Sequence, residues 1–582
     1  MGSPLLRVAL VAVFVAGFSR QSGPAATRPA AERSAAKRSA AERSAAERSA
    51  AKSVDTKLAA IDAVFTKFNS RTSPGCALAV IKDGHVVYQR GYGMANLEHE
   101  VPISPQTVFD IGSTSKQFTA ASVVLLAQDR RLGLDDDVHA YVPELPDYGA
   151  RITIRHLLTH TSGLRDYTDL LVLDGNDVAD VTTPQDALEC LVRQRGVNFP
   201  PGAEYSYCNS GFFLASVIVE RVTGKSLRQF ARERLFSPLG MSSTQYMDDH
   251  TLIVPHRATA YHQKDAGGFQ VDMSDWEQTG DGAVLTSVQD LARWDANFYS
   301  PAVGGRQLVD ALQTRGRLEN GSPLDYALGL VVDEYHGVRR VQHGGSWAGY
   351  RAMLMRFPDQ HFSVITLCNV DTARTAALAG RVADIFLAVP SQSTKTADLP
   401  VAADVSVADL ARCAGTYVNT RSGSVLRVEA KADRLVVSAG GAASELIPLG
   451  SGRFHREDEE SIVRFVPAGP GELRLELDAR PLPAVYDRVQ PPSELSEQKL
   501  AEFAGSYQSD ELSAPLTLRP HGGKLWVRSR KSGAVPLEPV FADAFRTDAD
   551  LIRFIREPAG RVAALSITRR GVRDLRLTKI TR

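Results

Sequence analysis

The sequence has few cysteines and none of the spacings that mark a cysteine-based site. Only five occur among 582 residues: Cys76, Cys190, Cys208, Cys368 and Cys413. Their odd number and the lack of a C-x-x-C pair indicate neither a zinc site nor a disulfide framework. We interpret them mainly as small buried residues.

The chain also lacks a charge imbalance and a long hydrophobic run. Lysines plus arginines number 67, as do aspartates plus glutamates, so the composition gives no electrostatic footprint for nucleic acid. The apolar run at 8–18 is short for a membrane span but suits the central region of a signal peptide. We expect residues 1–19 to be a signal peptide and the protein to be exported, periplasmic or secreted, with an uncleaved anchor as the alternative.

Large apolar residues are missing from the segment that follows, residues 20–53. Most of it is a tandem five-residue repeat of alanine with glutamate, lysine, arginine and serine. Such a segment cannot build a core, and its composition favours partial helicity. We predict a solvated linker; its slight basic excess leaves contact with an anionic envelope surface as an alternative.

Folded sequence begins near Val54, and the chain is long enough for several domains. Two strand-like segments at 76–93 flank the turn Lys82-Asp83-Gly84, which predicts a β-hairpin. A second group of strand-like segments lies at 327–369, and the sequence between the groups has mostly helical patterns. This order predicts a mixed α/β domain at 54–390, with one antiparallel sheet flanked by helices and a helical insertion.

A serine and a lysine three residues apart, Ser113 and Lys116, stand where a helical apolar pattern begins. The S-x-x-K spacing occurs four times in the chain, so the spacing alone decides nothing. Here the helical turn would bring the amine to the face of the hydroxyl. The free amides at the helix start would favour a developing oxyanion. An ordinary helix-capping role for Ser113 is the alternative.

Two later segments place polar residues at the ends of predicted elements. Tyr207 and Asn209 lie two residues apart before another helical pattern, within Y-C-N. His343 and Gly345 belong to H-G-G at the end of a predicted strand. Neither segment is specific alone, but both carry side chains suited to proton transfer and substrate binding.

The motifs S-T-S-K, Y-C-N and H-G-G, in this order, resemble those of the serine β-lactamase and penicillin-binding-protein family. The similarity points to its branch of class C β-lactamases, D-alanyl-D-alanine carboxypeptidases, esterases and D-aminopeptidases. It spans about residues 54–387 and includes the stretches 155–164 and 280–294. Three short motifs, each on the expected element, make the resemblance specific.

The resemblance implies a role for each motif residue. Ser113 would be the nucleophile and Lys116 a base kept neutral by desolvation. Tyr207 would shuttle a proton to the leaving group, and Asn209 would bind the substrate amide or ester. The backbone amides of Ser113 and Ser346 would form the oxyanion hole. No cofactor or metal is implied.

The third motif departs from the K-T-G of many penicillin-recognising members. His343 replaces a permanent cation, and histidine is only partly charged near neutral pH. We therefore expect weakened recognition of a β-lactam carboxylate, and a loss of activity on carboxylate substrates as the pH rises from 6 to 8. A purely structural role for His343 is the alternative. Other histidines carry less chemistry: His156 and His160 lack the glutamate of a zinc-binding H-E-x-x-H.

The C-terminal part is predicted to hold two small β-barrel modules, at 404–489 and 495–582. Landmarks of the first module, among them Tyr417, recur in the second, among them Tyr507, which indicates a tandem duplication. This arrangement resembles that of D-aminopeptidases, in which a loop of the last barrel reaches the active site. A role in stability or envelope contact is the alternative. We expect few contacts between these modules and the catalytic domain.

Together these features predict an exported serine hydrolase that forms an acyl-enzyme. Its expected substrates are small esters or D-amino-acid amides and peptides, cell-wall peptides included, with no nucleic-acid or metal partner. One alternative is a penicillin-binding sensor or scaffold with little turnover. Another is a weak β-lactamase or D-alanyl-D-alanine carboxypeptidase.

Overall fold

The computed structural model describes residues 56–387 and most of 405–580. Within the second range, gaps occur at 440–441, 457–460, 470–471, 479–482, 493–494 and 531–532. The predicted signal peptide and repeat linker, residues 1–53, lie outside the described residues. The described residues from Ile61 onward form one compact unit.

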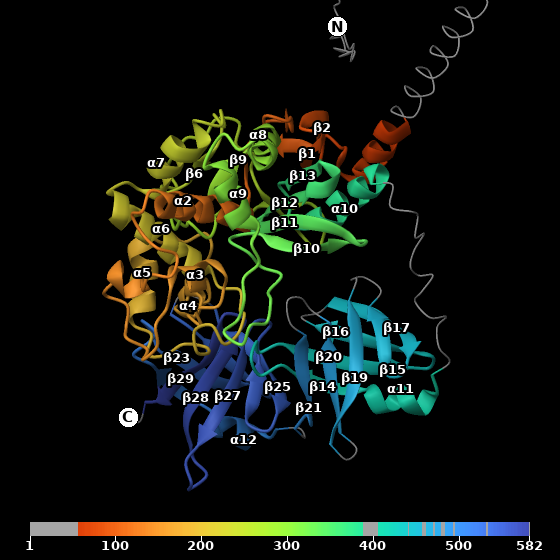
Figure 1. The fold of residues 1–582 in the computed structure, drawn as a ribbon. Helices are drawn as coiled ribbons and strands as arrows, with labels where there is room; N and C mark the ends of the chain where they lie inside the picture. Colours follow the sequence, from red (N-terminus) through yellow and green to blue (C-terminus); the bar gives the residue numbers. More distant parts are fainter. Residues whose placement is uncertain are drawn as a thin grey trace, which may run out of the picture. The chain divides into compact units, whose positions relative to one another are not determined.

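The centre of the first domain is a six-stranded antiparallel sheet in the order β10-β11-β12-β13-β1-β2. The strands are β1 (Cys76–Lys82), β2 (His85–Tyr92), β10 (Val331–Tyr335), β11 (Val338–Trp347), β12 (Tyr350–Phe357) and β13 (Phe362–Cys368). Strand β1 pairs with β13 along its whole length, so the two groups of predicted strands join in one sheet (Figure 1). The predicted antiparallel sheet is confirmed.

A disulfide bond joins Cys76 and Cys368, which lie opposite each other on β1 and β13. The sequence analysis found no indication of a disulfide framework, and it therefore missed this bond. The pairing follows from strand register, which brings together residues 292 positions apart. The other three cysteines, Cys190, Cys208 and Cys413, are free and buried, as interpreted from the sequence.

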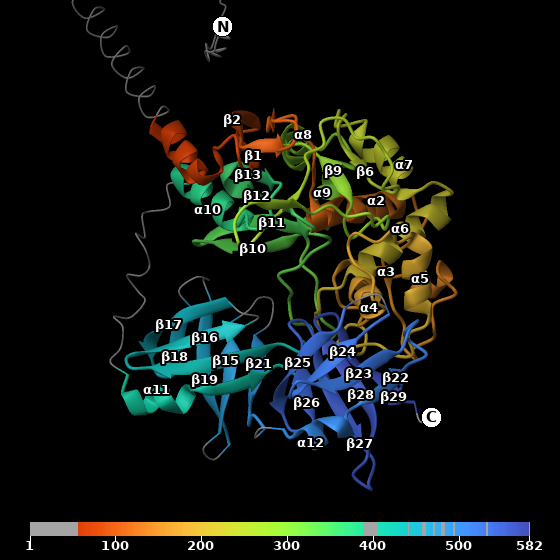
Figure 2. The same ribbon diagram turned by 180° about the vertical axis from the view of Figure 1, so that it is seen from behind.

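Helices flank the sheet and form the insertion beside it (Figure 2). They are α2 (Lys116–Gln128), α3 (Ile154–Leu158), α4 (Tyr167–Leu173), α5 (Pro184–Val192), α6 (Asn209–Thr223), α7 (Leu227–Ala231), α8 (Val288–Tyr299), α9 (Gly305–Gln313) and α10 (Thr375–Phe386). Helix α8 packs on β1 and β13, and α10 on β12 and β13. No helix in the described part of the chain combines the length and apolarity needed to cross a membrane.

Short elements complete this domain. They are the 3₁₀ turns η1 (Thr66–Phe68), η2 (Gly112–Ser115), η3 (Val138–Ala140) and η5 (Pro358–Gln360), the π-helical turn η4 (Arg232–Phe236), and the strands β3 (Met94–Asn96), β4 (Val101–Pro102), β5 (Phe109–Asp110), β6 (Gln245–Tyr246), β7 (Tyr261–Gln263), β8 (Phe269–Val271) and β9 (Val284–Thr286). Strand β9 pairs with both β5 and β6. Strand β5 leads directly into η2, so this small sheet positions the first motif.

The C-terminal part consists of two closed eight-stranded barrels. The first comprises β14 (Gly415–Val418), β15 (Val425–Lys431), β16 (Arg434–Ala439), β17 (Ala442–Gly450), β18 (Arg453–Arg456), β19 (Ile462–Gly469), β20 (Glu472–Leu477) and β21 (Ala484–Val489). The second comprises β22 (Gly505–Gln508), β23 (Leu516–His521), β24 (Lys524–Arg528), β25 (Val535–Phe541), β26 (Ala544–Arg546), β27 (Leu551–Arg556), β28 (Val562–Arg569) and β29 (Val572–Lys579).

Both barrels begin with the same local structure. A short helix, α11 (Val407–Cys413) or α12 (Glu497–Glu502), precedes the first strand of each. The buried hydroxyls of Tyr417 and Tyr507 donate to the backbone carbonyls of Cys413 and Phe503, each at 2.8 Å. The predicted pair of barrel modules is confirmed, and the repeated tyrosine contact supports the duplication.

The second barrel is tied to the first domain by buried contacts. Arg165 and Glu511 form an ion pair of 2.6 Å, and their side chains are only 7% and 11% exposed. Leu500 and Phe503 also belong to the same buried apolar cluster as the core of the first domain. The expectation that few contacts cross between the domain and the modules was wrong, because these contacts join residues far apart in sequence.

Candidate active site

A cleft of about 950 Å³ contains the three sequence motifs. Its lining includes the predicted site residues Ser113, Tyr207, Asn209, His343, Gly345 and Ser346. The second barrel adds Arg570 and Gly571. The structure therefore brings together side chains that the sequence separates by more than 400 positions.

Ser113 lies in the 3₁₀ turn η2, one turn before α2 begins at Lys116. Gly112 precedes it with a φ of +47°, and a Cβ there would come within 2.8 Å of the Ser346 nitrogen. Only glycine combines this backbone conformation with so close an approach. The Gly112 N–H donates to the Asp110 carboxyl at 2.7 Å. The turn is thus fixed with the Ser346 amide beside it.

Lys116 is fully buried and makes three hydrogen bonds to uncharged oxygens. Its Nζ donates to the Ser113 hydroxyl at 3.1 Å, to Asn209 Oδ1 at 2.8 Å and to the Asp281 carbonyl at 2.6 Å. Burial lowers the pKa of Lys116 to about 8, although the carboxyls of Asp281 and Asp166 oppose this effect. A lysine with this pKa is partly neutral near pH 7 to 8, so it can accept a proton from the adjacent hydroxyl.

Tyr207 packs against the same lysine. Lys116 Nζ lies 4.8 Å from the centre of the Tyr207 ring. Burial raises the pKa of Tyr207 far above its usual range, so the phenol is protonated at neutral pH. Its buried oxygen meets the criteria for a hydrogen bond with none of the described residues, but the Ser113 side chain lies close enough to oppose the rise of its pKa, so the phenol is beside the proposed nucleophile. Tyr205, two residues earlier, is not among the described residues that line this cleft.

Asn209 is the first residue of α6, and its side-chain oxygen faces Lys116. Its backbone N–H donates to a carboxyl oxygen of Asp166 at 2.5 Å. The other oxygen of Asp166 caps α4 by accepting from Thr168. Asp166 therefore fixes the start of α6 relative to the loop before α4.

His343 lies on β11 and is 5% exposed. Its Nδ1 lies 2.6 Å from the Gly344 carbonyl, which can only accept, so Nδ1 carries the proton. Its Nε2 then accepts from the Tyr326 hydroxyl at 2.9 Å. Burial, together with the charge of Lys116, lowers the pKa of His343 to about 4. The expectation of a partly charged histidine near neutral pH was wrong, because burial and the nearby Lys116 disfavour the imidazolium.

The two glycines after His343 face different surroundings. A Cβ on Gly345 would lie 1.8 Å from the Ile111 carbonyl oxygen. One on Gly344 would make only ordinary contacts, with the end of the Met353 side chain at 3.4 Å and the Ala352 carbonyl oxygen at 3.7 Å. Gly345 is therefore required for β11 to approach the backbone before Ser113. The approach also puts Ser346 at the cleft.

Sequence reasoning missed three residues that support the motifs: His160, Tyr326 and Asp281. The buried His160 ring lies 4.2 Å from that of Tyr207, and its Nδ1 accepts the Cys208 N–H at 3.1 Å. Its stretch, residues 155–164, was noted for family similarity, but no local pattern gave it a role. Tyr326 and the Asp281 carbonyl reach the site through tertiary contacts alone.

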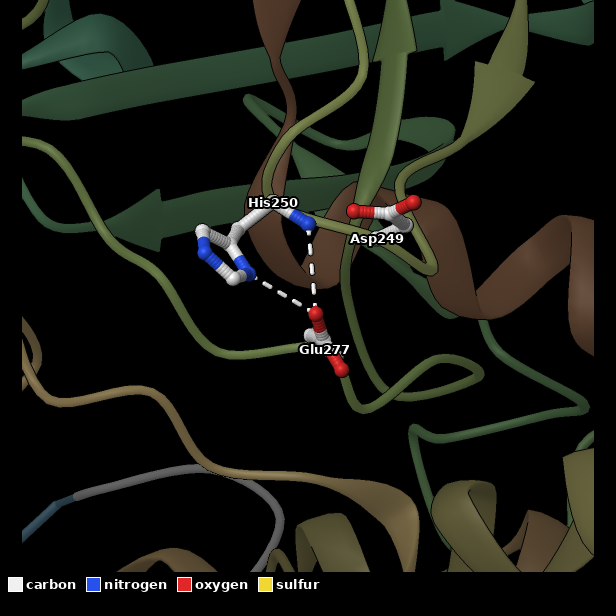
Figure 3. Close-up of side chains that lie close together, drawn as sticks. All are labelled: Asp249, His250 and Glu277. Atoms are coloured by element: carbon white, nitrogen blue, oxygen red, sulfur yellow. Dashed lines mark hydrogen bonds and ion pairs between the residues drawn. The ribbon is translucent and has the colours of Figure 1, made fainter.

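Three side chains of the kinds that bind metal ions lie close together outside these motifs. Ligand atoms of Asp249, His250 and Glu277 lie within 4.8 Å of one another (Figure 3). His250 pairs with Glu277 at 2.8 Å, and Asp249 accepts from the backbone and hydroxyl of Thr251. These hydrogen bonds account for the grouping, so we assign no metal to it.

The turn between β28 and β29 brings the second barrel to the cleft. The Gly571 N–H donates to Asp169 at 2.8 Å, and its carbonyl accepts from the Asp166 N–H at 2.9 Å. Asn198 also donates to that carbonyl at 2.9 Å. The turn is therefore bound to the loop that holds Asn209.

The fold and the three motifs define a serine hydrolase. The chain belongs to the β-lactamase family: the family model "Beta-lactamase" matches residues 57–387. A D-aminopeptidase of Brucella anthropi is 30% identical over 477 residues, which cover 81% of this chain and 86% of that protein. A D-aminopeptidase of Cereibacter sphaeroides is 29% identical and covers 80% and 84%.

Among solved structures, an octameric penicillin-binding protein homologue from Pyrococcus abyssi has the same fold. The match has a TM-score of 0.53 and 23% identity, and it covers 75% of this chain and 99% of that one. The family predicted from the motifs is confirmed, including its D-aminopeptidase branch.

Proposed function

We propose that this protein hydrolyses amides and short peptides of D-amino acids, and simple esters, through an acyl-enzyme formed on Ser113. One observation carries the proposal: the buried Lys116 amine lies 3.1 Å from the Ser113 hydroxyl and has a lowered pKa. A nucleophile within hydrogen-bond reach of a base is the arrangement that such catalysis requires.

In the proposed reaction, the Ser113 oxygen attacks the substrate carbonyl while Lys116 takes its proton. The Ser113 and Ser346 amides stabilise the oxyanion. When the bond to the leaving nitrogen breaks, Tyr207 donates the proton to that nitrogen and is reprotonated from Lys116. Water then attacks the ester carbonyl, and its proton passes to Lys116 and Tyr207. The bond between the acyl group and the Ser113 oxygen breaks, and that oxygen takes up the proton. Asn209 holds the acyl group in position.

Two observations favour D-amino-acid amides over β-lactams as substrates. The relatives that match most of the chain are D-aminopeptidases. On β11, the position that carries a lysine in K-T-G members holds a neutral histidine, His343, with no charge to offer a β-lactam carboxylate. Turnover of a penicillin would be correspondingly slow.

We further propose that the protein is exported. The apolar segment at 8–18 has the features of a signal peptide. The Cys76–Cys368 disulfide supports this location, because disulfides persist in oxidising compartments. Cell-wall peptides, which contain D-amino acids, would be accessible substrates there. Contact of the repeat at 20–53 with the envelope concerns residues outside the described ones.

The test is a substrate panel with the Ser113→Ala variant as control. We expect hydrolysis of D-alaninamide and p-nitrophenyl acetate, little of L-alaninamide, and slow hydrolysis of a chromogenic cephalosporin. Ser113→Ala should abolish all of these activities. Acylation by penicillin without turnover of any amide or ester would instead favour a penicillin-binding sensor.

A further inference from the structure

One arginine of the second barrel, Arg570, stands at the tip of the turn that enters the cleft. Both of its neighbours are anchored. Arg569 is buried and pairs with Asp550 at 2.8 Å, and Gly571 is hydrogen-bonded to Asp169 and to the Asp166 backbone. A tip held on both sides presents its side chain from a fixed position.

Arg570 itself is exposed and lines the cleft. Among the described residues, no hydrogen bond or ion pair is formed by its side chain. Its charge acts on the phenols of Tyr205 and Tyr207, where it opposes the rise of the pKa that burial causes. The guanidinium is therefore near the reacting groups and free to bind a ligand.

The carboxyls that line the cleft already have other partners. Asp166 accepts from the Asn209 backbone and from Thr168. Asp169 accepts from Gly571, and both oxygens of Asp281 accept from the Tyr167 hydroxyl at 3.1 Å. None of these groups neutralises the Arg570 guanidinium.

The opposite wall of the cleft offers no competing cation from the third motif, because His343 is neutral. Arg351, also in the lining, donates to the carbonyls of Ala348 and Tyr350. Arg257 and Arg374 line the cleft as well. Arg570 differs from them because its charge acts on the phenols of Tyr205 and Tyr207, so it offers a carboxylate near the reacting groups a planar guanidinium able to bind it in bidentate fashion.

We propose that Arg570 recognises a carboxylate of the substrate, so that the enzyme prefers acidic D-amino-acid peptides or amides to neutral ones. The inference rests on the proposed function and adds the charge of the substrate to it. The carboxylate has two sources: the free C-terminus of a departing amino acid, or an acidic side chain on the acyl residue.

The experiment measures kcat/KM of the full-length protein for three substrates. They are D-alaninamide, which has no carboxylate; D-alanyl-D-alanine, which has one on the leaving group; and the α-amide of D-glutamate, which has one on the acyl side. The variants are Arg570→Ala and, as matched control, Arg374→Ala. Arg374 is another exposed arginine that lines the same cleft.

Loss of a hydrogen bond to a charged group typically lowers kcat/KM by about 10- to 100-fold. We expect Arg570→Ala to lower kcat/KM by that factor for at least one carboxylate substrate and to leave D-alaninamide within about twofold. The substrate that loses activity identifies which carboxylate is bound. Arg374→Ala should leave all three ratios unchanged.

Two failures are distinguishable. If the wild type neither hydrolyses these substrates nor is labelled at Ser113 by a neutral fluorophosphonate, the proposed function fails. The second failure arises when the wild type is active and Arg570→Ala is labelled at the normal rate. If the substrate ratios of Arg570→Ala then match those of the wild type, Arg570 does not bind a carboxylate. Added salt should weaken the preference of the wild type for carboxylate substrates and leave the substrate ratios of Arg570→Ala unchanged.

Discussion

The buried ion pair between Arg165 and Glu511 predicts that the second barrel stabilises the catalytic domain. Glu511 also accepts the Arg195 N–H at 2.6 Å, so replacing it with alanine removes two charge-assisted hydrogen bonds. Removing one partner of a buried pair costs about 3–5 kcal/mol. Arg165 keeps its bond to Gln194 Oε1 at 2.9 Å. We therefore expect Glu511→Ala to lower the free energy of unfolding by about 3 kcal/mol.

The same variant should also affect the site. The Arg165 carbonyl accepts from the Ser210 hydroxyl at 2.7 Å, and the next residue, Asp166, holds the Asn209 backbone. A shift of this loop would move Asn209 relative to Lys116. Glu511→Ala should accordingly raise KM for amide substrates as well as lower stability.

The assay is urea unfolding followed by circular dichroism, with residual activity measured in parallel. Glu557→Ala in the same barrel is the matched control, because Arg561 and Glu557 form an exposed pair with side chains 80% and 41% accessible. Such surface pairs contribute little, so its free energy of unfolding should change by less than about 1 kcal/mol. Equal shifts for the two variants would refute the reasoning.

Three further predictions follow from the site. Because burial lowers the pKa of Lys116 to about 8, kcat/KM should rise with pH and level off above that value as the amine loses its proton. A pH profile that is flat from 6 to 9 would contradict this. Because the pKa of His343 is about 4, this residue stays neutral from pH 6 to 8. The ratio of kcat/KM for acidic substrates to kcat/KM for neutral substrates should therefore stay constant over this range. Gly345→Ala should abolish Ser113 labelling, because its Cβ would lie 1.8 Å from the Ile111 oxygen, whereas Gly344→Ala should be labelled normally.

Local patterns were enough to predict much of the fold. The turn at Asp83-Gly84 joins β1 to β2 as expected, and the repeated landmarks around Tyr417 and Tyr507 lead to two similar barrels. The Cys76–Cys368 disulfide was missed because it depends on the register between distant strands. The Arg165–Glu511 contact was missed for a similar reason, since nothing near either residue in sequence indicates its partner.

The candidate site, too, was predicted from the sequence in part. Spacing, element boundaries and the resemblance to the family together singled out Ser113, Lys116 and Tyr207, and the structure brings these three residues together. The sequence did not reveal that His343 is buried and neutral, because its environment depends on Tyr326, which approaches from another segment. The carboxylate-binding role proposed for Arg570 likewise depends on how the second barrel docks.

The most direct test of the account is the site of covalent attachment. The full-length protein would be incubated with a neutral fluorophosphonate, digested, and its modified peptide identified by mass spectrometry. We predict a single adduct on Ser113, with labelling slowed when Lys116 is replaced by alanine and absent from Ser113→Ala. An adduct on any other serine, or labelling of Ser113→Ala at the wild-type rate, would contradict the proposed nucleophile and with it the mechanism.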